Sequence, residues 1–236
     1  MRESIILPTY NERVNIGALI REILEKVNPA EVIVVDDDSP DRTWEVVKNF
    51  DDPRVKLIRR TDERGLTSAI KRGITSAIGD VVVWMDCDFS MPPSVIPELL
   101  KAVEEYDIAI GSRYIDGAKD DRESLRERAG SWIINRLARF ILDPSINDYT
   151  SGFVAARKKI FSPDSETFSG VHLKGDYGEY CIDLLYSAKR KGFTIKEIPY
   201  VCITRRHGES KTATNIFKYL KRGMGYIYTI LRLKFP

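Results

Sequence analysis

Residues 81–93 read VVVWMDCDFSMPP, an apolar run that ends abruptly in two carboxylates separated by one residue. The run before Asp86 is typical of a strand buried on both faces of a sheet. Asp86 and Asp88 follow it directly. Because charged side chains are rarely buried without a partner, these acids should lie at the mouth of a cleft and not in the core.

The first two-fifths of the chain alternates β-branched runs with amphipathic stretches. Continuous apolar strands that alternate with helices indicate a parallel sheet covered on both faces. We therefore predict an α/β fold with a doubly wound, mostly parallel central sheet of the Rossmann-like type. The expected strands are 4–7, 31–36, 55–58, 81–85 and 107–112, and the expected helices lie near 16–27, 44–50, 66–77 and 95–103.

The second half of the chain is less regular. Its expected elements are a helix at 118–142, a turn-rich stretch at 147–153, a helix at 178–191, a strand at 194–203 and a cationic tail at 213–236. No repeat or flexible linker interrupts the chain, so we predict a single domain over 1–236. Segments 118–142 and 213–236 combine apolar side chains, aromatic rings and cations, as helices in a membrane interface do. The alternative is that both segments simply pack on the domain or form a dimer contact.

Charge and cysteine content exclude several classes of protein. The 37 Lys and Arg nearly cancel the 35 Asp and Glu, and the net charge of +2 gives no case for nucleic-acid binding. Cys87, Cys181 and Cys202 lack a CxxC spacing, which disfavours a zinc site or a disulfide framework and favours a reducing cytosol. No stretch approaches the ~20 apolar residues that cross a bilayer.

Polar segments follow four of the expected strands, namely PTYNE (8–12), DDDSPD (36–41), DCDFS (86–90) and GSRY (111–114). In doubly wound sheets, ligands bind outside the carboxyl ends of the strands, so these segments should converge on one crevice. The first two also suit ordinary turns, with Asn11 as one helix cap and Asp41 or Ser39 as the other. Asp36 and Asp37 are not needed for capping and could accept hydrogen bonds from a base or ribose.

The spacing of Asp86 and Asp88 is compatible with a metal site. Residues i and i+2 of an extended chain point to the same side, so both carboxylates can approach one cation. Hard oxygen ligands suit Mg²⁺ or Mn²⁺. The pattern alone is weak, because it recurs at Asp36 and Asp38 and because two solvated loop acids would look the same. Its position at the end of a central strand favours the metal.

A basic loop near the carboxyl-terminal tail is a second candidate for binding phosphate. Arg205 and Arg206 precede GESK (208–211), and together they combine a glycine hinge with three cations and a hydroxyl. Such a loop suits phosphate oxygens, although a solvated basic loop has the same composition. Cys87, between the two acids, should point the other way, into packing.

Together these segments resemble the inverting family 2 glycosyltransferases of the GT-A type. The closest likeness is to the polyprenyl-phosphate glycosyltransferases, which include the dolichol-phosphate mannose synthases. The likeness covers nearly the whole chain, and any one motif is weak while eight in order are hard to obtain by chance. The motifs are PTYNE, DDDSPDRT, RGLTSAIKRGI, GDVVVWMDCDFSMPP, GSRY, DYTSGF, IKEIPY and RRHGESK.

The resemblance implies roles for the residues at matching positions. The nucleotide would contact Pro8, Tyr10, Glu12, Val35, Asp37, Asp86, Cys87, Arg205, Ser210 and Lys211. The metal would be held by Asp86 and Asp88, with Ser90 nearby. The acceptor phosphate would be held by Arg113, Arg128 and Ser131. The residues closest to the chemistry would be Asp88, Arg113, Arg128 and Arg205.

The implied reaction moves a hexose from a sugar nucleotide to a polyprenyl or dolichyl phosphate, with inversion to a β-linked product. Mannose from GDP-mannose is favoured over glucose from UDP-glucose. A phosphate monoester has its second pKa near ~6, so the acceptor is largely dianionic and needs no strong base. The divalent ion would neutralise the leaving group. The implied location is cytoplasmic, with peripheral attachment to the cytoplasmic face of a membrane.

Two other functions remain open. A sugar hydroxyl as acceptor would require a carboxylate base, for which Glu179 or Asp183 could serve, although the family often has Lys and Glu at these two positions. A sugar-nucleotide-binding module without turnover would not need both the DCD and RRHGESK segments. Many relatives continue into transmembrane helices, whereas this sequence stops at Pro236. We therefore expect another route to the lipid, or a membrane-anchoring partner subunit.

Overall fold

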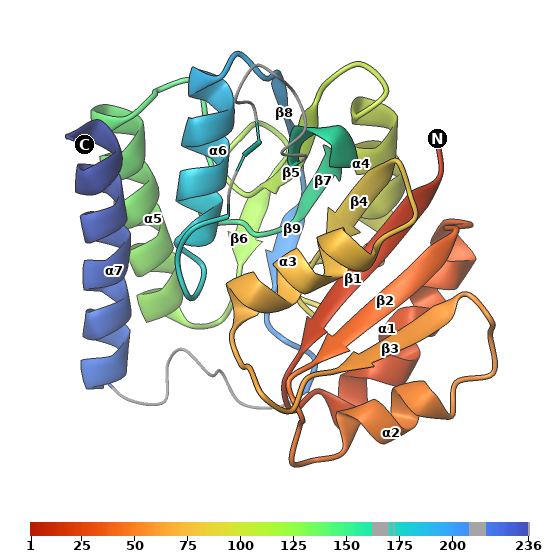
Figure 1. Ribbon diagram of the computed structural model, residues 1–236. Coiled ribbons are helices and arrows are strands. Elements are labelled where there is room, and N and C mark those ends of the chain that lie inside the picture. Colours follow the sequence, from red (N-terminus) through yellow and green to blue (C-terminus); the bar gives the residue numbers. More distant parts are fainter. Residues whose placement is uncertain (162–169, 172, 208–215, 236) are drawn as a thin grey trace.

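A computed structural model describes residues 1–161, 170–171, 173–207 and 216–235, with only the backbone of 216–221. The chain forms a seven-stranded sheet with helices on both faces (Figure 1). The strand order is β3-β2-β1-β4-β7-β5-β8. The prediction of a doubly wound, mostly parallel α/β fold is confirmed, whereas the extent of the domain stays a prediction.

The strands of the main sheet are β1 (Glu3–Thr9), β2 (Glu31–Asp36), β3 (Val55–Arg59), β4 (Val81–Trp84), β5 (Ile108–Ser112), β7 (Val154–Arg157) and β8 (Ile195–Pro199). Each neighbouring pair is parallel except where β7 lies antiparallel between β4 and β5. The sequence did not predict β7, because the stretch VAAR is short and half alanine, a residue that is depleted in strands.

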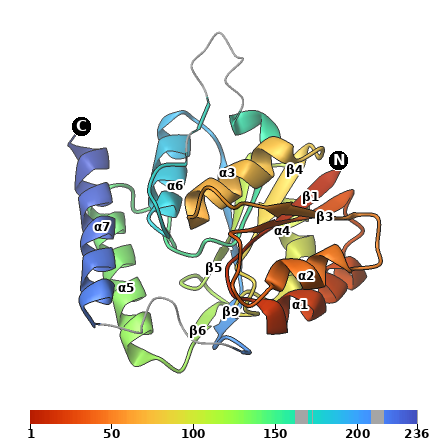
Figure 2. The ribbon, with the colours of Figure 1, turned by 60° about the horizontal axis from the view of Figure 1, so that its bottom comes forward.

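The helices are α1 (Arg13–Lys26), α2 (Thr43–Lys48), α3 (Leu66–Ser76), α4 (Ile96–Ala102), α5 (Leu125–Ile141), α6 (Tyr180–Arg190) and α7 (Ile216–Lys234), with 3₁₀ turns at Pro93–Val95 and Lys158–Phe161. Alternate residues of the central strands face opposite layers. Ile5 and Leu7 of β1 pack with α1 and α4, whereas Ile6 packs with α3 and α6. Figure 2 shows the two helical layers on either side of the sheet.

Two elements of the second half differ from prediction. The expected helix at 118–142 begins only at Leu125, where the Ser124 hydroxyl caps it by accepting a hydrogen bond from the Glu127 amide (3.3 Å). The preceding residues form β6 (Lys119–Asp121), which pairs in parallel with β9 (Val201–Ile203). The expected strand at 194–203 is therefore two strands, β8 and β9, divided at Tyr200.

Helices α5 and α7 lie side by side at the edge of the molecule farthest from α1 and α2, in both views (Figures 1 and 2). Within the described ranges, every helix is too short or too polar to span a bilayer. All three cysteines are buried and free, as their spacing predicted.

Candidate active site

A cavity of about 690 Å³ opens at the carboxyl ends of β4 and β5. The segments DCDFS and GSRY, expected to converge, meet in its wall. Its wall combines charged and polar side chains with apolar residues of α5 and α7. Its principal lining residues are Asp86, Asp88, Ser90, Arg113, Arg122, Ser131, Ile133, Ile134, Thr150, Arg205, Tyr226 and Ile227.

The two acids after β4 occupy one wall of this cavity. Asp86 is exposed, whereas Asp88 is buried. Asp88 Oδ1 accepts a hydrogen bond from the Ser90 amide (3.0 Å), and Oδ2 pairs with Arg205 Nη2 (2.9 Å). The thiol of Cys87 points away and donates to the Pro8 carbonyl (3.4 Å), so its side chain packs in the core and leaves the cavity wall to the carboxylates.

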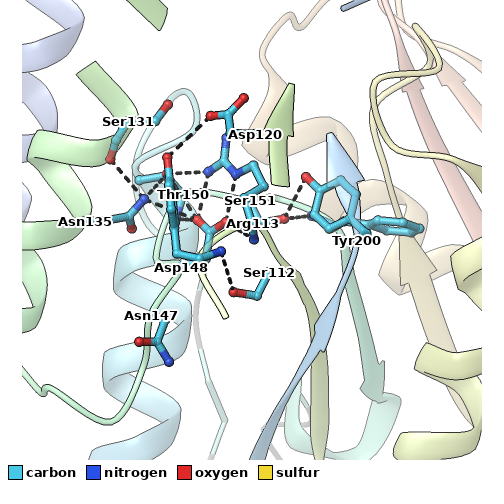
Figure 3. Close-up of polar contacts among 12 residues, drawn as sticks. Ser112, Arg113, Asp120, Ser131, Asn135, Asn147, Asp148, Thr150, Ser151 and Tyr200 are labelled. Carbon is cyan, nitrogen blue, oxygen red and sulfur yellow. Dashed lines mark hydrogen bonds and ion pairs between the residues drawn. The ribbon is translucent and has the colours of Figure 1, made fainter. Parts of the chain in front are cut away.

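Opposite them, Arg113 is held by a buried carboxylate (Figure 3). Its Nε and Nη2 donate to the two oxygens of Asp148, both at 2.8 Å, and Nη2 also donates to Thr150 Oγ1 (2.8 Å). Burial would lower the pKa of Arg113, but Asp148 outweighs it and holds the pKa well above its ordinary value. Arg113 therefore stays charged at the cavity wall, and its Nη1 has no hydrogen-bond partner among the described residues.

The other predicted acceptor residues divide between the cavity and the surface. Ser131 lines the cavity, but the side chain of Arg128 is exposed and outside it. The role of Arg128 in binding the acceptor therefore stays a prediction, and Arg122 is an arginine of the same segment that does line the cavity. The sequence could not select Arg122 from the arginines at 122–128, since the segment had been assigned to one continuous helix.

The predicted nucleoside residues lie at the same edge of the sheet, outside this cavity. Pro8 and Tyr10 are partly exposed after β1, and Arg64 lies 5.5 Å above the Tyr10 ring. The Glu12 carboxylate is buried and accepts from Asn15 Nδ2 (2.9 Å). The side chain of Val35 is wholly buried in the core, and its contact with a nucleotide stays a prediction.

Asp37 is also buried, and the protein itself supplies its donors. It forms an ion pair with Arg60 and accepts a hydrogen bond from the Gly65 amide (2.8 Å). This pairing fixes the segment between β3 and α3 beside the end of β2. Any contact between Asp37 and a nucleoside would add to these bonds.

The turns after β1 and β2 correct two further predictions. Asn11 does not cap α1, because Asp41 Oδ2 accepts from the Arg13 amide (3.0 Å) at the start of that helix. Asp41 Oδ1 accepts from the Thr43 amide (2.9 Å) at the start of α2. Asp36 is fully buried and bonded to Thr9 and Ser39, so it is not available to a base or ribose.

The alternative base candidates serve structural roles. Glu179 Oε1 accepts from the amides of Asp176 (2.9 Å) and Tyr177 (3.3 Å), which holds the turn before α6. Asp183 is buried and pairs with Arg232, which fixes α7 to α6. Neither carboxylate lines the cavity. Ser210 and Lys211 of the GESK loop lie outside the described residues.

Comparison with solved structures identifies the fold. A glucosyl-3-phosphoglycerate synthase from Mycobacterium tuberculosis, in complex with Mn²⁺, UDP and glucosyl-3-phosphoglycerate, superposes with a TM-score of 0.73. It is 20% identical over 99% of this chain and 80% of that chain. The likeness at this identity concerns the architecture of the sheet and its flanking helices.

Comparison of sequences identifies the family. A dolichol-phosphate mannosyltransferase of Pyrococcus furiosus is 40% identical over 98% of this chain, which spans only 64% of that protein's length. An undecaprenyl-phosphate mannosyltransferase of Micrococcus luteus is 33% identical over 92% of this chain and 89% of that protein. A polyprenol monophosphomannose synthase of Mycolicibacterium smegmatis is 34% identical over 89% of this chain and 80% of that protein. Residues 4–163 match the model of glycosyl transferase family 2, and the chain belongs to that family.

Proposed function

We propose that the protein transfers mannose from GDP-mannose to a polyprenyl phosphate, using a divalent cation and inverting the anomeric carbon. The observation that carries the proposal is one cavity that joins paired carboxylates, a buried arginine and an apolar wall. The three relatives, at 33–40% identity, are named for mannosyl transfer to lipid phosphates of this kind. A phosphate bound to a lipid has both a polar and an apolar part, as the cavity has.

The donor end of the cavity, defined by Asp86, Asp88 and Arg205, fits a metal–diphosphate. In the described part of the chain, no three His, Cys, Asp or Glu side chains gather to form a metal site. Mg²⁺ and Mn²⁺ sites on phosphorylated substrates need only one or two carboxylates, because the phosphates complete the shell. The bound ion would neutralise charge on the departing diphosphate. Arg205, now paired with Asp88, lies within reach of the same phosphates.

The acceptor end, defined by Arg113 and Ser131, fits the phosphate of the acceptor. An oxygen of that phosphate would form the new bond to the anomeric carbon as the bond to the diphosphate breaks. The acceptor is already dianionic, so no protein group has to remove a proton. The positions of Glu179 and Asp183, outside the cavity, support a phosphate acceptor over a sugar hydroxyl.

The outer surface of α5 and α7 supports contact with a membrane. Its exposed apolar side chains include Trp132, Phe140, Met224, Tyr228 and Phe235, which are 54–89% exposed. Arginines on α5 accompany them, as in helices that lie among lipid headgroups. We propose that this surface, the α5–α7 face, rests on the cytoplasmic face of a membrane and brings the cavity to the lipid. A membrane-anchoring partner subunit could strengthen that attachment.

The test is a transfer assay with a short-chain polyprenyl phosphate, Mn²⁺ or Mg²⁺, and radiolabelled GDP-mannose or UDP-glucose. We expect metal-dependent label in the organic phase from GDP-mannose, with a β linkage by NMR. Product from UDP-glucose alone would change the donor but keep the reaction. Nucleotide binding with no lipid product from either donor would contradict the proposal.

A further inference from the structure

A second arginine lies beside Arg113 in the wall of the cavity, on the segment that joins β6 to α5. The side chain of Arg122 is 17% exposed. Its Nε and Nη2 donate to the two oxygens of Asp120, at 2.8 and 2.6 Å. Nη2 also donates to Ser131 Oγ (3.1 Å). The guanidinium is thereby fixed in one orientation, as Arg113 is by Asp148.

Both arginines keep a donor group for a ligand. The Nη1 of Arg122 has only an ion pair with Glu127 Oε2 at 3.9 Å, beyond hydrogen-bond distance. The Nη1 of Arg113 has no hydrogen-bond partner among the described residues. Figure 3 shows Asp120 and Ser131 gathered around the Arg113–Asp148 pair, which places the second arginine's partners next to the first.

The two guanidinium groups also influence each other electrostatically. Burial and the charge of Arg113 both act to lower the pKa of Arg122, and the bond to Asp120 outweighs them and raises it. Asp148 and Asp120 balance and orient the two guanidinium groups, and their Nη1 groups remain as donors for a phosphate monoester, which carries nearly two negative charges at neutral pH. The Ser131 hydroxyl, which accepts from Arg122, adds a third donor.

We propose that Arg122, together with Arg113, binds the phosphate of the acceptor, and that Arg128 does not. This inference rests on the proposed function, since it names the residues that hold the acceptor there. Arg122 would contact only the phosphate group of the polyprenyl phosphate. Substitution of Arg122 should therefore weaken binding of the acceptor and leave binding of the sugar nucleotide unchanged.

The kinetic test compares Arg122→Gln and Arg122→Lys with the matched control Arg128→Gln, on the same segment. We expect Arg122→Gln to raise the KM for a short-chain polyprenyl phosphate roughly 10- to 100-fold, as expected for loss of a charge-assisted bond. Arg122→Lys should recover part of the lost affinity for the acceptor, because lysine keeps the positive charge but lacks the two-pronged donor geometry of the guanidinium. The KM for GDP-mannose should stay within about twofold in every variant. An unchanged acceptor KM in Arg122→Gln, or an equal rise in Arg128→Gln, would overturn the inference.

A binding measurement shows whether Arg122 contacts the ligand or only supports the fold, and it does not depend on the proposed reaction. The affinity of each variant for the short-chain polyprenyl phosphate and for the matching polyprenol is measured without donor. The melting temperature of each variant is measured as well. The wild type should prefer the phosphate, and Arg122→Gln should lose that preference while the melting temperature and GDP-mannose binding persist. Equal loss of donor binding would show that Arg122 only supports the fold and would overturn the inference. If the wild type bound the polyprenyl phosphate selectively but formed no lipid product, the proposed function would be contradicted and the inference about Arg122 would stand.

Discussion

The two ends of the cavity handle charge in opposite ways. At the donor end, Asp86 is exposed and Asp88 has a single arginine partner in the described part of the chain, so the wall is acidic. At the acceptor end, Arg113 is buried and Arg122 is partly buried, and each is fixed by a carboxylate of its own. Under the proposed function, the donor end would depend on a cation that arrives with its substrate, whereas the acceptor end has its cations built into the fold.

This difference affects stability mainly at the acceptor end. Asp86 is exposed and well solvated, and Asp88, although buried, pairs with an arginine whose side chain is 23% exposed. A buried ion pair is favourable only while both partners are present, and removal of one leaves an uncompensated charge. Changes at the donor end should therefore damage mainly activity, and removal of Asp148 at the acceptor end should damage both activity and folding.

The largest effect should come from Asp88→Asn. Loss of a metal-binding carboxylate should reduce transfer by about 1,000-fold, a far larger effect than the loss of its ion pair with Arg205 has on stability. The matched control is Asp38→Asn, in the second DxD pattern of the chain, whose carboxylate pairs with Arg59 outside the cavity. Initial rates with radiolabelled GDP-mannose measure both. A comparable loss of transfer activity in the two variants would contradict a special role for the DCD segment.

The next effect concerns the acceptor end. Asp148→Ala leaves Arg113 buried without its partner, so the free energy of unfolding should fall by about 3–5 kcal/mol. The matched control is Asp116→Ala, at an exposed position shortly after β5, the strand that precedes Arg113. This change should alter the free energy of unfolding by less than about 0.5 kcal/mol. Urea denaturation of both variants provides the measurement. Similar stability of the two would mean that the buried pair does not maintain this end of the cavity.

The α5–α7 face extends the comparison to the lipid. The double variant Phe140→Asp and Tyr228→Asp should lower partitioning onto vesicles with anionic lipids by about tenfold or more, because both side chains are exposed and apolar. Val14→Asp, 72% exposed on α1, is the matched control and should partition as the wild type does. Cosedimentation measures this directly. If Val14→Asp detached the protein equally, a different surface would face the membrane.

The smallest effect concerns Glu31, at the amino end of β2, on the side of the sheet away from the cavity. Burial would raise the pKa of Glu31, but hydrogen bonds from Lys56, the Ile78 amide and Ser4 outweigh it and lower the pKa below its ordinary value of 4.5. A lowered folded-state pKa contributes stability above that value, which is lost as pH falls through the folded-state pKa. The stability gap between wild type and Glu31→Gln should therefore be about 1–2 kcal/mol at neutral pH and should shrink below about pH 4. A gap that widened in acid would reverse the sign and contradict this reading.

The donor end was largely predictable from the sequence, and the acceptor end was not. The bounds of β2 and the placement of the DCD segment followed from apolar runs that end in polar residues. The acceptor end depends on β6, a three-residue strand whose partner β9 is distant in sequence. Local periodicity cannot reveal such pairing, so Arg128 was chosen where Arg122 lines the cavity. The sequence does not predict the antiparallel β7 either, because that strand is short and half alanine.

The most direct test of the contrast between the two ends is calorimetric titration of GDP-mannose and of a short-chain polyprenyl phosphate, each with Mn²⁺ and with EDTA. We expect removal of the metal to weaken GDP-mannose binding at least about tenfold and to leave polyprenyl phosphate binding within about twofold. Metal-independent binding of the donor, or equal metal dependence of both ligands, would contradict the assignment of one end to a metal–diphosphate and the other to a phosphate held by arginines.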